Sequence, residues 1–152
     1  MTYPQRYVPR QLSRRDAKTQ RRLLKKSRDL YKKHQFYTRK PLSSFRNKPS
    51  KHVAFARSMY KVKTVAPSKE LAKKTGCTMA ALNRIVQKGE GAYYSSGSRP
   101  NQTPQSWGLA RLASAVTGGN AAVVDYAILE EGCDPSKKAL KLANQRVHSR
   151  KF

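Results

Sequence analysis

The stretch Gly91 to Gly119, GAYYSSGSRPNQTPQSWGLARLASAVTGG, carries the sharpest helix boundaries in the chain. The Thr103 hydroxyl can accept an unpaired backbone N–H, and Pro104 suits a first helical position, where no hydrogen bond is lost. Apolar residues then recur at helical spacing until a glycine pair interrupts them. The stretch therefore predicts a helix over 104–116, whose core or interface side chains are Trp107, Leu109, Leu112 and Val116.

The residues before this helix predict an irregular or β-like turn. Ala92 to Tyr94 is typical of a short extended piece, and the small residues of 95–101 favour a tight turn. Such a turn could direct backbone N–H groups toward a phosphate, and Arg99 within it could add a positive charge. It lacks the lysine and the glycine spacing of a nucleotide-binding loop, so we expect a packed or partner-facing turn.

The same region carries a family resemblance. Residues 91–133, GAYYSSGSRPNQTPQSWGLARLASAVTGGNAAVVDYAILEEGC, resemble a domain that recurs in giant double-stranded DNA viruses of algae and protists, with relatives in large tailed phages. The basic segments YVPRQLSRRDAKTQ, LYKKHQFYTRK and SKELAKKTGC resemble the usual N-terminal companion of that domain, so the resemblance covers nearly the whole chain. It implies a basic, viral, virion-associated protein.

The distribution of charge predicts three parts. The chain has 152 residues and a net charge of +25, which is typical of proteins that meet polyanions or acidic surfaces. Residues 1–63 hold 20 Lys and Arg against 2 acids, residues 64–135 hold 7 against 6, and residues 136–152 hold 6 against none. We expect a basic arm over 1–63, a compact helical core over 64–135 and a basic C-terminal helix or tail over 136–152. A core of this size has only marginal stability alone, and we expect contacts with partners to stabilise it.

Two cysteines and the absence of long apolar runs limit the other possibilities. Cys77 and Cys133 can form at most one disulfide, and we expect two buried thiols in a reducing compartment. No run approaches the roughly 18 apolar residues of a membrane span, and the N-terminus lacks an apolar signal core. We therefore expect a soluble protein made in the cytosol.

The arm combines cations with aromatic residues. Residues 1–12 favour an extended lead, Ser13 caps a basic helix to about Lys33, residues 34–49 form a connector laid on a surface, and Ser50 caps a helix to about Tyr60. Tyrosine between arginines suits either base stacking or a protein groove. The arm residues predicted to bind a partner are Tyr3, Arg6, Tyr7, Arg10, Arg14, Arg15, Arg21, Arg22, Lys25, Lys26, Lys32, Lys33, Phe36, Tyr37, Arg39, Lys40 and Phe45.

Residues 68–89 have the spacing of a helix-turn-helix. Ser68 caps a helix to about Thr75, Gly76 permits the turn, and Thr78 caps a second helix that Gly89 ends. The spacing resembles repressor-type units, but pairs of this kind also pack without reading DNA, and we expect packing. The possible nucleic-acid contacts are Thr78, Asn83, Arg84, Lys88 and Arg99.

Two further helices are expected after the glycine pair. Asn120 is expected to cap a helix over 121–131 that is apolar on nearly every side, with Val124 and Ile128 in the core or an interface. Asp134 and Pro135 start a last helix with a basic outer face. The fold class is therefore mainly α, with a small helical core that contains the helix-turn-helix-like pair and one irregular turn, preceded by a long basic arm that is part helix and part extended.

Nothing in the sequence indicates catalysis. No nucleophile and base are placed together, and the three histidines lie among cations without the carboxylate or thiol cluster of a metal site. We expect no enzymatic activity, no cofactor, no metal and no small-molecule substrate.

Two non-enzymatic functions remain. The first is a structural protein of the virion of a large DNA virus, made in the host cytoplasm. It would be a minor capsid protein of the inner shell whose arms thread along other capsid proteins and stabilise the capsid. The second is a protein that binds viral DNA and packages or condenses the genome, with help from the helix-turn-helix.

Overall fold

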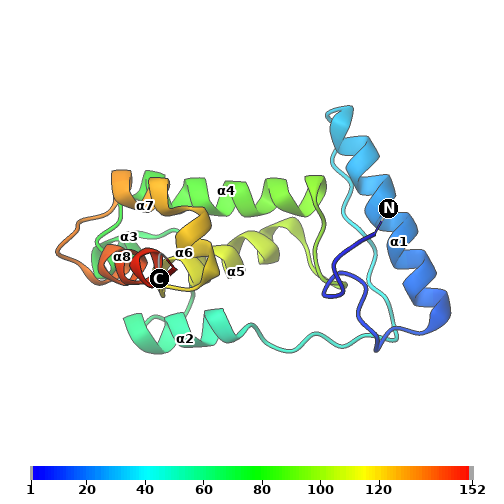
Figure 1. Cartoon of the computed structure of the whole chain (residues 1–152), viewed down its shortest axis with the longest axis horizontal. Coiled ribbons are helices and arrows are strands. Elements are labelled where there is room, and N and C mark those ends of the chain that lie inside the picture. Colours follow the sequence, from blue (N-terminus) through cyan, green and yellow to red (C-terminus); the bar gives the residue numbers. More distant parts are fainter. Residues whose placement is uncertain (1, 151–152) are drawn as a thin grey trace. The chain divides into compact units, whose positions relative to one another are not determined.

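The protein is mainly helical, as its sequence predicts. The structure is a computed structural model that describes residues 2–150, and these residues contain eight α-helices and no strand (Figure 1). The helices are α1 (Arg14–Lys32), α2 (Lys51–Tyr60), α3 (Lys69–Thr75), α4 (Met79–Ser95), α5 (Pro104–Val116), α6 (Asn120–Val124), α7 (Tyr126–Gly132) and α8 (Lys138–Arg150).

The chain divides into two compact units. Unit 1 consists of Met1–Lys48 with Glu90–Trp107, and unit 2 of Pro49–Gly89 with Gly108–Phe152, so that α4 and α5 each contribute to both. The division does not follow the predicted boundaries after residues 63 and 135. The physical reason is packing: buried side chains of α2 and of α8 belong to the hydrophobic core of unit 2.

Five predicted helix starts are confirmed by their capping hydrogen bonds. The hydroxyls of Ser13, Ser50, Ser68 and Thr78 accept backbone N–H groups at 3.1, 3.3, 3.0 and 3.1 Å. The Thr103 hydroxyl accepts the N–H of Ser106 at 3.0 Å, and the Ser106 hydroxyl accepts the N–H of Thr103 at 2.9 Å. This reciprocal pair satisfies two donors at the start of α5.

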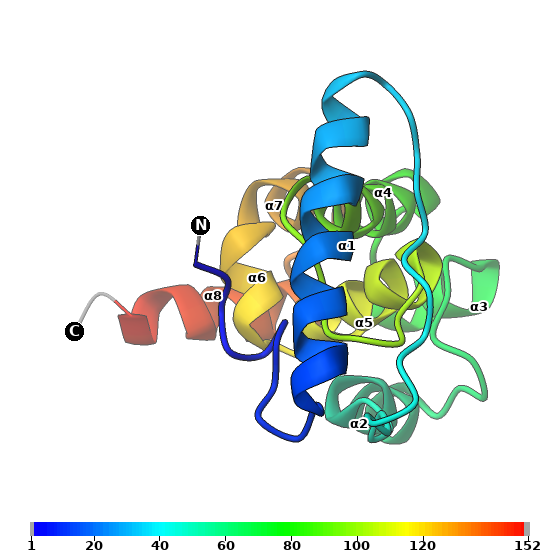
Figure 2. The same cartoon turned by 90° about the vertical axis from the view of Figure 1, so that its right-hand side faces the viewer.

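In unit 1 the connector runs back along α1 (Figure 2). Leu42 is buried, and its backbone bonds the side chain of Asn101, whose Oδ1 accepts the Leu42 N–H at 2.6 Å. The predicted packed turn over 95–101 is thus confirmed, and it packs against the connector. Two tight turns also fold residues 4–12, since the N–H groups of Tyr7 and Leu12 bond the carbonyls of Pro4 and Pro9. The prediction of an extended lead is wrong there, because these hydrogen bonds close the backbone into turns.

The predicted end of α4 at Gly89 is also wrong. The helix continues through Gly89 and Gly91 to Ser95, so that Ala92 to Tyr94 is helical rather than extended. A Cβ at Gly89 would lie 2.6 Å from the Gly108 Cα, so this glycine permits a close crossing of α4 and α5. Packing of the fully buried Tyr93 offsets the roughly 1 kcal/mol that each helical glycine costs.

Unit 2 contains the helix-turn-helix-like pair and a hydrophobic core. Gly76 has a φ of 80° in the turn after α3, and Leu82 and Ile85 of α4 are fully buried. Helices α6, α7 and α8 pack on one another. A Cβ at Gly132 would lie 2.5 Å from the Ala81 Cβ, so the end of α7 lies directly against the start of α4.

The single helix predicted over 121–131 is two helices. They are α6 and α7, which meet at Asp125, where φ is −103° and ψ is 21°. Gly119, rather than Asn120, is the N-cap of α6, and it provides no side-chain hydrogen bond. The last helix begins at Lys138, three residues beyond Pro135, because the Asp134 carboxylate bonds the N–H of Ser136 at 2.8 Å and stabilises a turn there.

Cys77 and Cys133 form a disulfide, so the expectation of two free thiols is wrong. Two backbone hydrogen bonds flank the pair, from Thr78 N–H to the Gly132 carbonyl and from Asp134 N–H to the Gly76 carbonyl, each at 2.8 Å. This isolated antiparallel bridge brings together residues 56 positions apart. Spacing alone could not predict it, because the bridge depends on α7 folding against α4.

Candidate nucleic-acid interface

The exposed face of α1 is the most cationic surface of unit 1. Gln20, Leu23, Leu24 and Ser27 are the buried residues of this helix and form one stripe. The opposite side carries two rows of cations at spacings of three, four or seven residues, over a helix about 27 Å long. The exposed members of these rows are Arg14, Lys18, Arg21, Lys25 and Lys32 in one, and Arg15, Arg22, Lys26 and Lys33 in the other.

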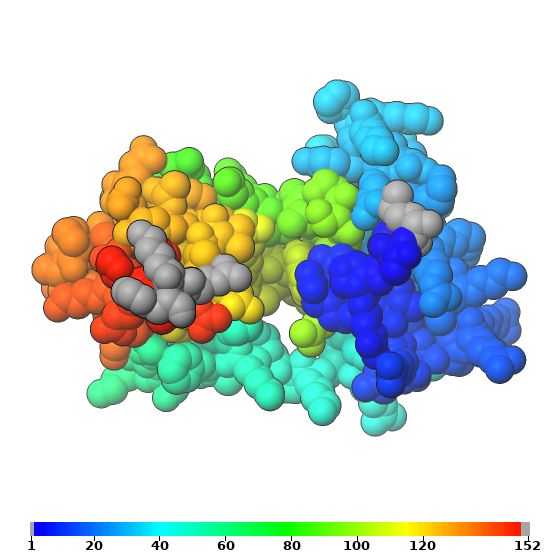
Figure 3. Space-filling model, viewed as in Figure 1, coloured from blue at the N-terminus to red at the C-terminus, as the bar shows by residue number. Residues whose placement is uncertain are grey.

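Few of these cations have a partner within the described part of the chain. Lys25 pairs with Asp29 at 2.8 Å, and Lys26 lies 4.3 Å from the centre of the Tyr37 ring. The Lys25–Asp29 pair is exposed and contributes little to stability. The long side chains of α1 stand out from the surface in Figure 3. The face is therefore available to an anionic partner.

The start of α1 is held by a polar cluster with the connector. Asp16 accepts the N–H and the hydroxyl of Ser44 at 3.0 and 2.5 Å, and the Ser44 hydroxyl accepts the N–H of Ser13 at 3.0 Å. These bonds hold the pKa of the Asp16 carboxyl below its usual range. Asp16 is thus used in hydrogen bonds inside the unit, and its carboxylate forms no salt bridge with an arginine of residues 2–150.

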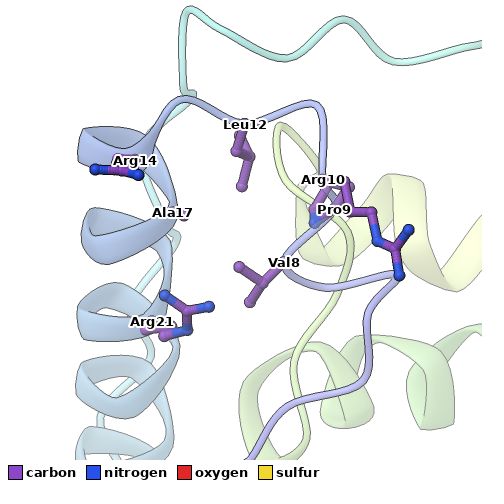
Figure 4. A pocket seen from close by; sticks show the side chains of 7 residues that line it. All are labelled: Val8, Pro9, Arg10, Leu12, Arg14, Ala17 and Arg21. Carbon is purple, nitrogen blue, oxygen red and sulfur yellow. The ribbon is translucent and has the colours of Figure 1, made fainter.

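A hollow of about 390 Å³ lies beside the first turns of α1. Its apolar lining comes from Val8, Pro9, Leu12 and Ala17, and Arg21 reaches from α1 toward Val8 (Figure 4). The remaining lining residues are Arg10 and Arg14.

Two predicted arm residues are buried inside unit 1, so their assignment to a partner surface is wrong. Tyr7 is 6% exposed, and its ring packs edge-on against Trp107 with centroids 6.3 Å apart. Arg39 is also 6% exposed. Both residues lie in segments that turn back over α1, which a single sequence does not reveal.

Arg39 connects four parts of unit 1. Its guanidinium donates to the hydroxyls of Ser27 and Ser98 at 2.7 and 2.8 Å and to the Tyr93 carbonyl at 3.0 Å. It also lies 3.8 Å from the centre of the Tyr93 ring, and the Arg39 N–H donates to the Tyr93 hydroxyl at 2.8 Å. Burial lowers the pKa of Arg39 and raises that of Tyr93. This arginine therefore serves the fold.

The other arm residues remain at the surface. Tyr3, Tyr37 and Phe45 are half-buried. Those that are exposed, besides the cations of α1, are Arg6, Arg10, Phe36 and Lys40. The structure therefore brings most of the predicted arm cations together on α1 rather than along an extended arm.

The helix-turn-helix-like pair presents a second, smaller polar face in unit 2. Thr78, Asn83, Arg84 and Lys88 are all exposed. Arg84 lies 3.3 Å from Glu131 of α7, which reduces the positive potential of this face. Arg99 is exposed too but belongs to unit 1. DNA reading by this pair remains a prediction.

The predicted core residues divide into two groups. Leu112, Val116 and Ile128 are buried, and Trp107 and Leu109 are half-buried. Val124 is 68% exposed, so of its two predicted places, the core or an interface, the core is excluded. The break at Asp125 turns the end of α6 outward.

An ion pair that the sequence did not predict explains this break. Arg111 donates to both carboxylate oxygens of Asp125, whose side chain is fully buried. Asp125 is the one acid in the otherwise apolar run 121–129. An acid in such a run indicates a buried carboxylate that needs a partner, and this pattern could have predicted the ion pair.

Residues 2–150 contain neither a metal-binding cluster nor a membrane-spanning helix. This part of the chain holds no cluster of three or more His, Cys, Asp or Glu side chains that could bind a metal ion. It also has no helix with the length and apolar character needed to cross a membrane.

Comparison with known proteins gives a single result. A model described as a family of unknown function (DUF5824) matches residues 4–140. No curated protein and no solved structure matches the chain.

Proposed function

The chain belongs to this family of unknown function, DUF5824, and we propose that it is a non-enzymatic nucleic-acid-binding protein of the virion of a large DNA virus. It would be made in the host cytoplasm and would contact the packaged genome. The observation that carries this proposal is the exposed face of α1. Of the nine exposed cations on this face, Lys25 alone forms an ion pair within residues 2–150.

The charge of the two units supports a polyanionic partner. Unit 1 has 17 Lys and Arg against 3 acids, and unit 2 has 16 against 5, so their net charges are +14 and +11. Proteins that neutralise phosphates release counterions, and this supplies affinity for any sequence of DNA. A face of many cations and few neighbouring acids suits such binding better than selective base contacts do.

Two observations favour the virion. Residues 91–133 resemble a domain of large DNA viruses, and they contain α5, α6 and α7. The disulfide between Cys77 and Cys133 suits a protein that persists outside the reducing cytosol, as virion proteins do.

A minor capsid protein of the inner shell is the second candidate. Phe55 of α2 and Val124 of α6 are 55% and 68% exposed in unit 2, and exposed apolar side chains of this size suit contacts with other capsid proteins. The arms would then stabilise the shell. We rank this candidate second because residues 2–48, which would thread between neighbours, pack within unit 1.

Binding to a random-sequence DNA duplex over a series of salt concentrations tests the proposal. We expect tight binding at low salt and a log–log slope of magnitude about 6 or more, which corresponds to roughly seven neutralised phosphates. Weak binding or a shallow slope would instead favour the capsid candidate.

Charge-removing variants locate the binding face. R14Q/R21Q/R22Q removes three α1 cations and should reduce the slope by about 3, at roughly 0.9 for each phosphate contact. K137Q/K138Q/K141Q removes the same charge from exposed residues of unit 2 and should change the slope by less than about 1. Equal effects of the two variants would show that α1 is not the binding face.

A further inference from the structure

Three aromatic rings meet in unit 1 at the C-terminal end of α1. The rings of Tyr31 and Tyr94 are nearly parallel, with centroids 5.8 Å apart and an interplanar angle of 8°. Phe36 lies 5.2 Å from Tyr94 and 6.0 Å from Tyr31, at angles of 51° and 54°. Yet Phe36 is 69% exposed, the highest value among the large apolar residues that are exposed in the described chain.

The backbone holds Phe36 in this position. After α1 ends, His34 has a φ of 61°, and the N–H groups of His34 and Gln35 bond the carbonyls of Tyr31 and Leu30, each at 2.9 Å. This left-handed turn reverses the chain and returns Phe36 to the ring of Tyr31. Phe36 is therefore a positioned side chain with one side against two rings and the other open.

Two exposed lysines precede this ring in the sequence. Lys32 and Lys33 have no ion pair or side-chain hydrogen bond within residues 2–150. Of the nearby acids, Asp29 is paired with Lys25, and Glu90 lies one helical turn before Tyr94 on α4. Gln35, directly before the ring, is exposed and polar, and Tyr37, directly after it, is half-buried. A partner with a flat apolar face and negative charge suits the ring and the two lysines.

We propose that Phe36 stacks on an unpaired base of single-stranded nucleic acid, while Lys32 and Lys33 contact the adjoining phosphates. This inference rests on the proposed function and names its substrate: unpaired segments in addition to duplex. An open aromatic face beside cations is the arrangement by which proteins bind single strands of any sequence. Bases inside a duplex are covered by their neighbours and cannot stack on a side chain without being displaced.

A protein partner fits this surface less well. The centres of protein–protein interfaces are depleted in lysine and contain several apolar side chains around an aromatic anchor. Here the open side of one aromatic ring follows two exposed lysines and a polar glutamine in the sequence.

The test uses the full chain and a single-stranded oligonucleotide that contains 2-aminopurine, whose fluorescence falls when the base stacks. We expect binding of the wild type to quench this fluorescence. F36A should weaken single-strand binding about tenfold or more and abolish the quenching, because one stacked base is worth that much. The affinity of F36A for a duplex of the same length should stay within about twofold of wild type.

Three further variants make the result specific. F36W keeps a flat ring and should retain binding and quenching, whereas F36L keeps only apolar bulk and should lose both. F55A removes an exposed phenylalanine from unit 2 and should behave as wild type. Because Phe36 is exposed, melting of F36A should match the wild type and exclude misfolding.

The outcomes separate this inference from the proposed function. Steep salt-dependent duplex binding together with wild-type single-strand binding by F36A or F36L would overturn the stacking role alone. If the wild type binds neither the duplex nor the single strand, the proposed function would be overturned as well.

Discussion

Arg111 and Asp125 form a bidentate ion pair in unit 2, with Nε–Oδ2 and Nη2–Oδ1 distances of 2.7 and 2.6 Å. The Asp125 side chain is fully buried, and that of Arg111 is 21% exposed. The carbonyl of Asp125 accepts the N–H groups of Ile128 and Leu129 in the first turn of α7. The pair therefore links α5 to the junction of α6 and α7.

D125N should destabilise unit 2 by about 3 kcal/mol, because it leaves a half-buried guanidinium without its counter-charge. Urea unfolding followed by circular dichroism measures this change. E131Q is the matched control, since it breaks the exposed pair of Glu131 with Arg84 and should cost under about 1 kcal/mol. Similar costs for the two variants would contradict a structural role for the buried pair.

Gly89 and Gly91 should respond to alanine in opposite directions, although both lie inside α4. A Cβ at Gly89 would lie 2.6 Å from the Gly108 Cα, so G89A should destabilise the protein by roughly 1–3 kcal/mol. At Gly91 the nearest atom is the Tyr31 hydroxyl at 3.7 Å, so G91A should stabilise it by up to about 1 kcal/mol. Thermal melting of the two variants tests this, and stabilisation by G89A would refute the close crossing.

The disulfide should stabilise unit 2 strongly. It joins residues 56 positions apart, and closing a loop of that length in the unfolded chain is worth about 4 kcal/mol in the chain-entropy model. C77A/C133A should lower the free energy of unfolding by roughly that amount, as measured in urea. Adding a reductant should change the wild type and leave the variant unaltered. Two reactive thiols in the unfolded, unreduced wild type would contradict the bond.

The bond between Asp16 and Ser44 should make the start of α1 sensitive to acid. The pKa of Asp16 is lower in the folded protein than in the unfolded chain, where it is about 3.9. The carboxylate therefore stabilises the folded state above that unfolded-state pKa, and this stabilisation is lost as the pH falls through the folded-state pKa. In S44A the Asp16 pKa should rise toward that ordinary value, as followed by carboxyl NMR. Asp134 is an internal control, since Ser136 holds its pKa low and should keep it there. An unchanged Asp16 pKa in S44A would contradict this assignment.

The sequence by itself determined the helical class, most helix starts and the position of the cations. Caps such as Ser13 and Thr103 act within three residues of themselves, so local sequence is sufficient to identify them. The cations of α1 were predictable for a related reason: charged side chains remain at the surface, and helical spacing fixes which of them share a face. Most of the candidate interface therefore follows from local pattern.

Only the tertiary structure decided which residues are buried away from that interface. Arg39 is an ordinary surface cation by sequence, and contacts with Tyr93 and Ser98, more than fifty positions away, bring it inside. Gly89 is a plausible helix end by sequence, and the approach of Gly108 makes it a point where two helices cross. Such contacts join distant segments, and packing energy there exceeds local preference by a few kcal/mol. Phe36, which the sequence placed among the partner-binding residues, stays exposed because the fold leaves one side of its ring uncovered.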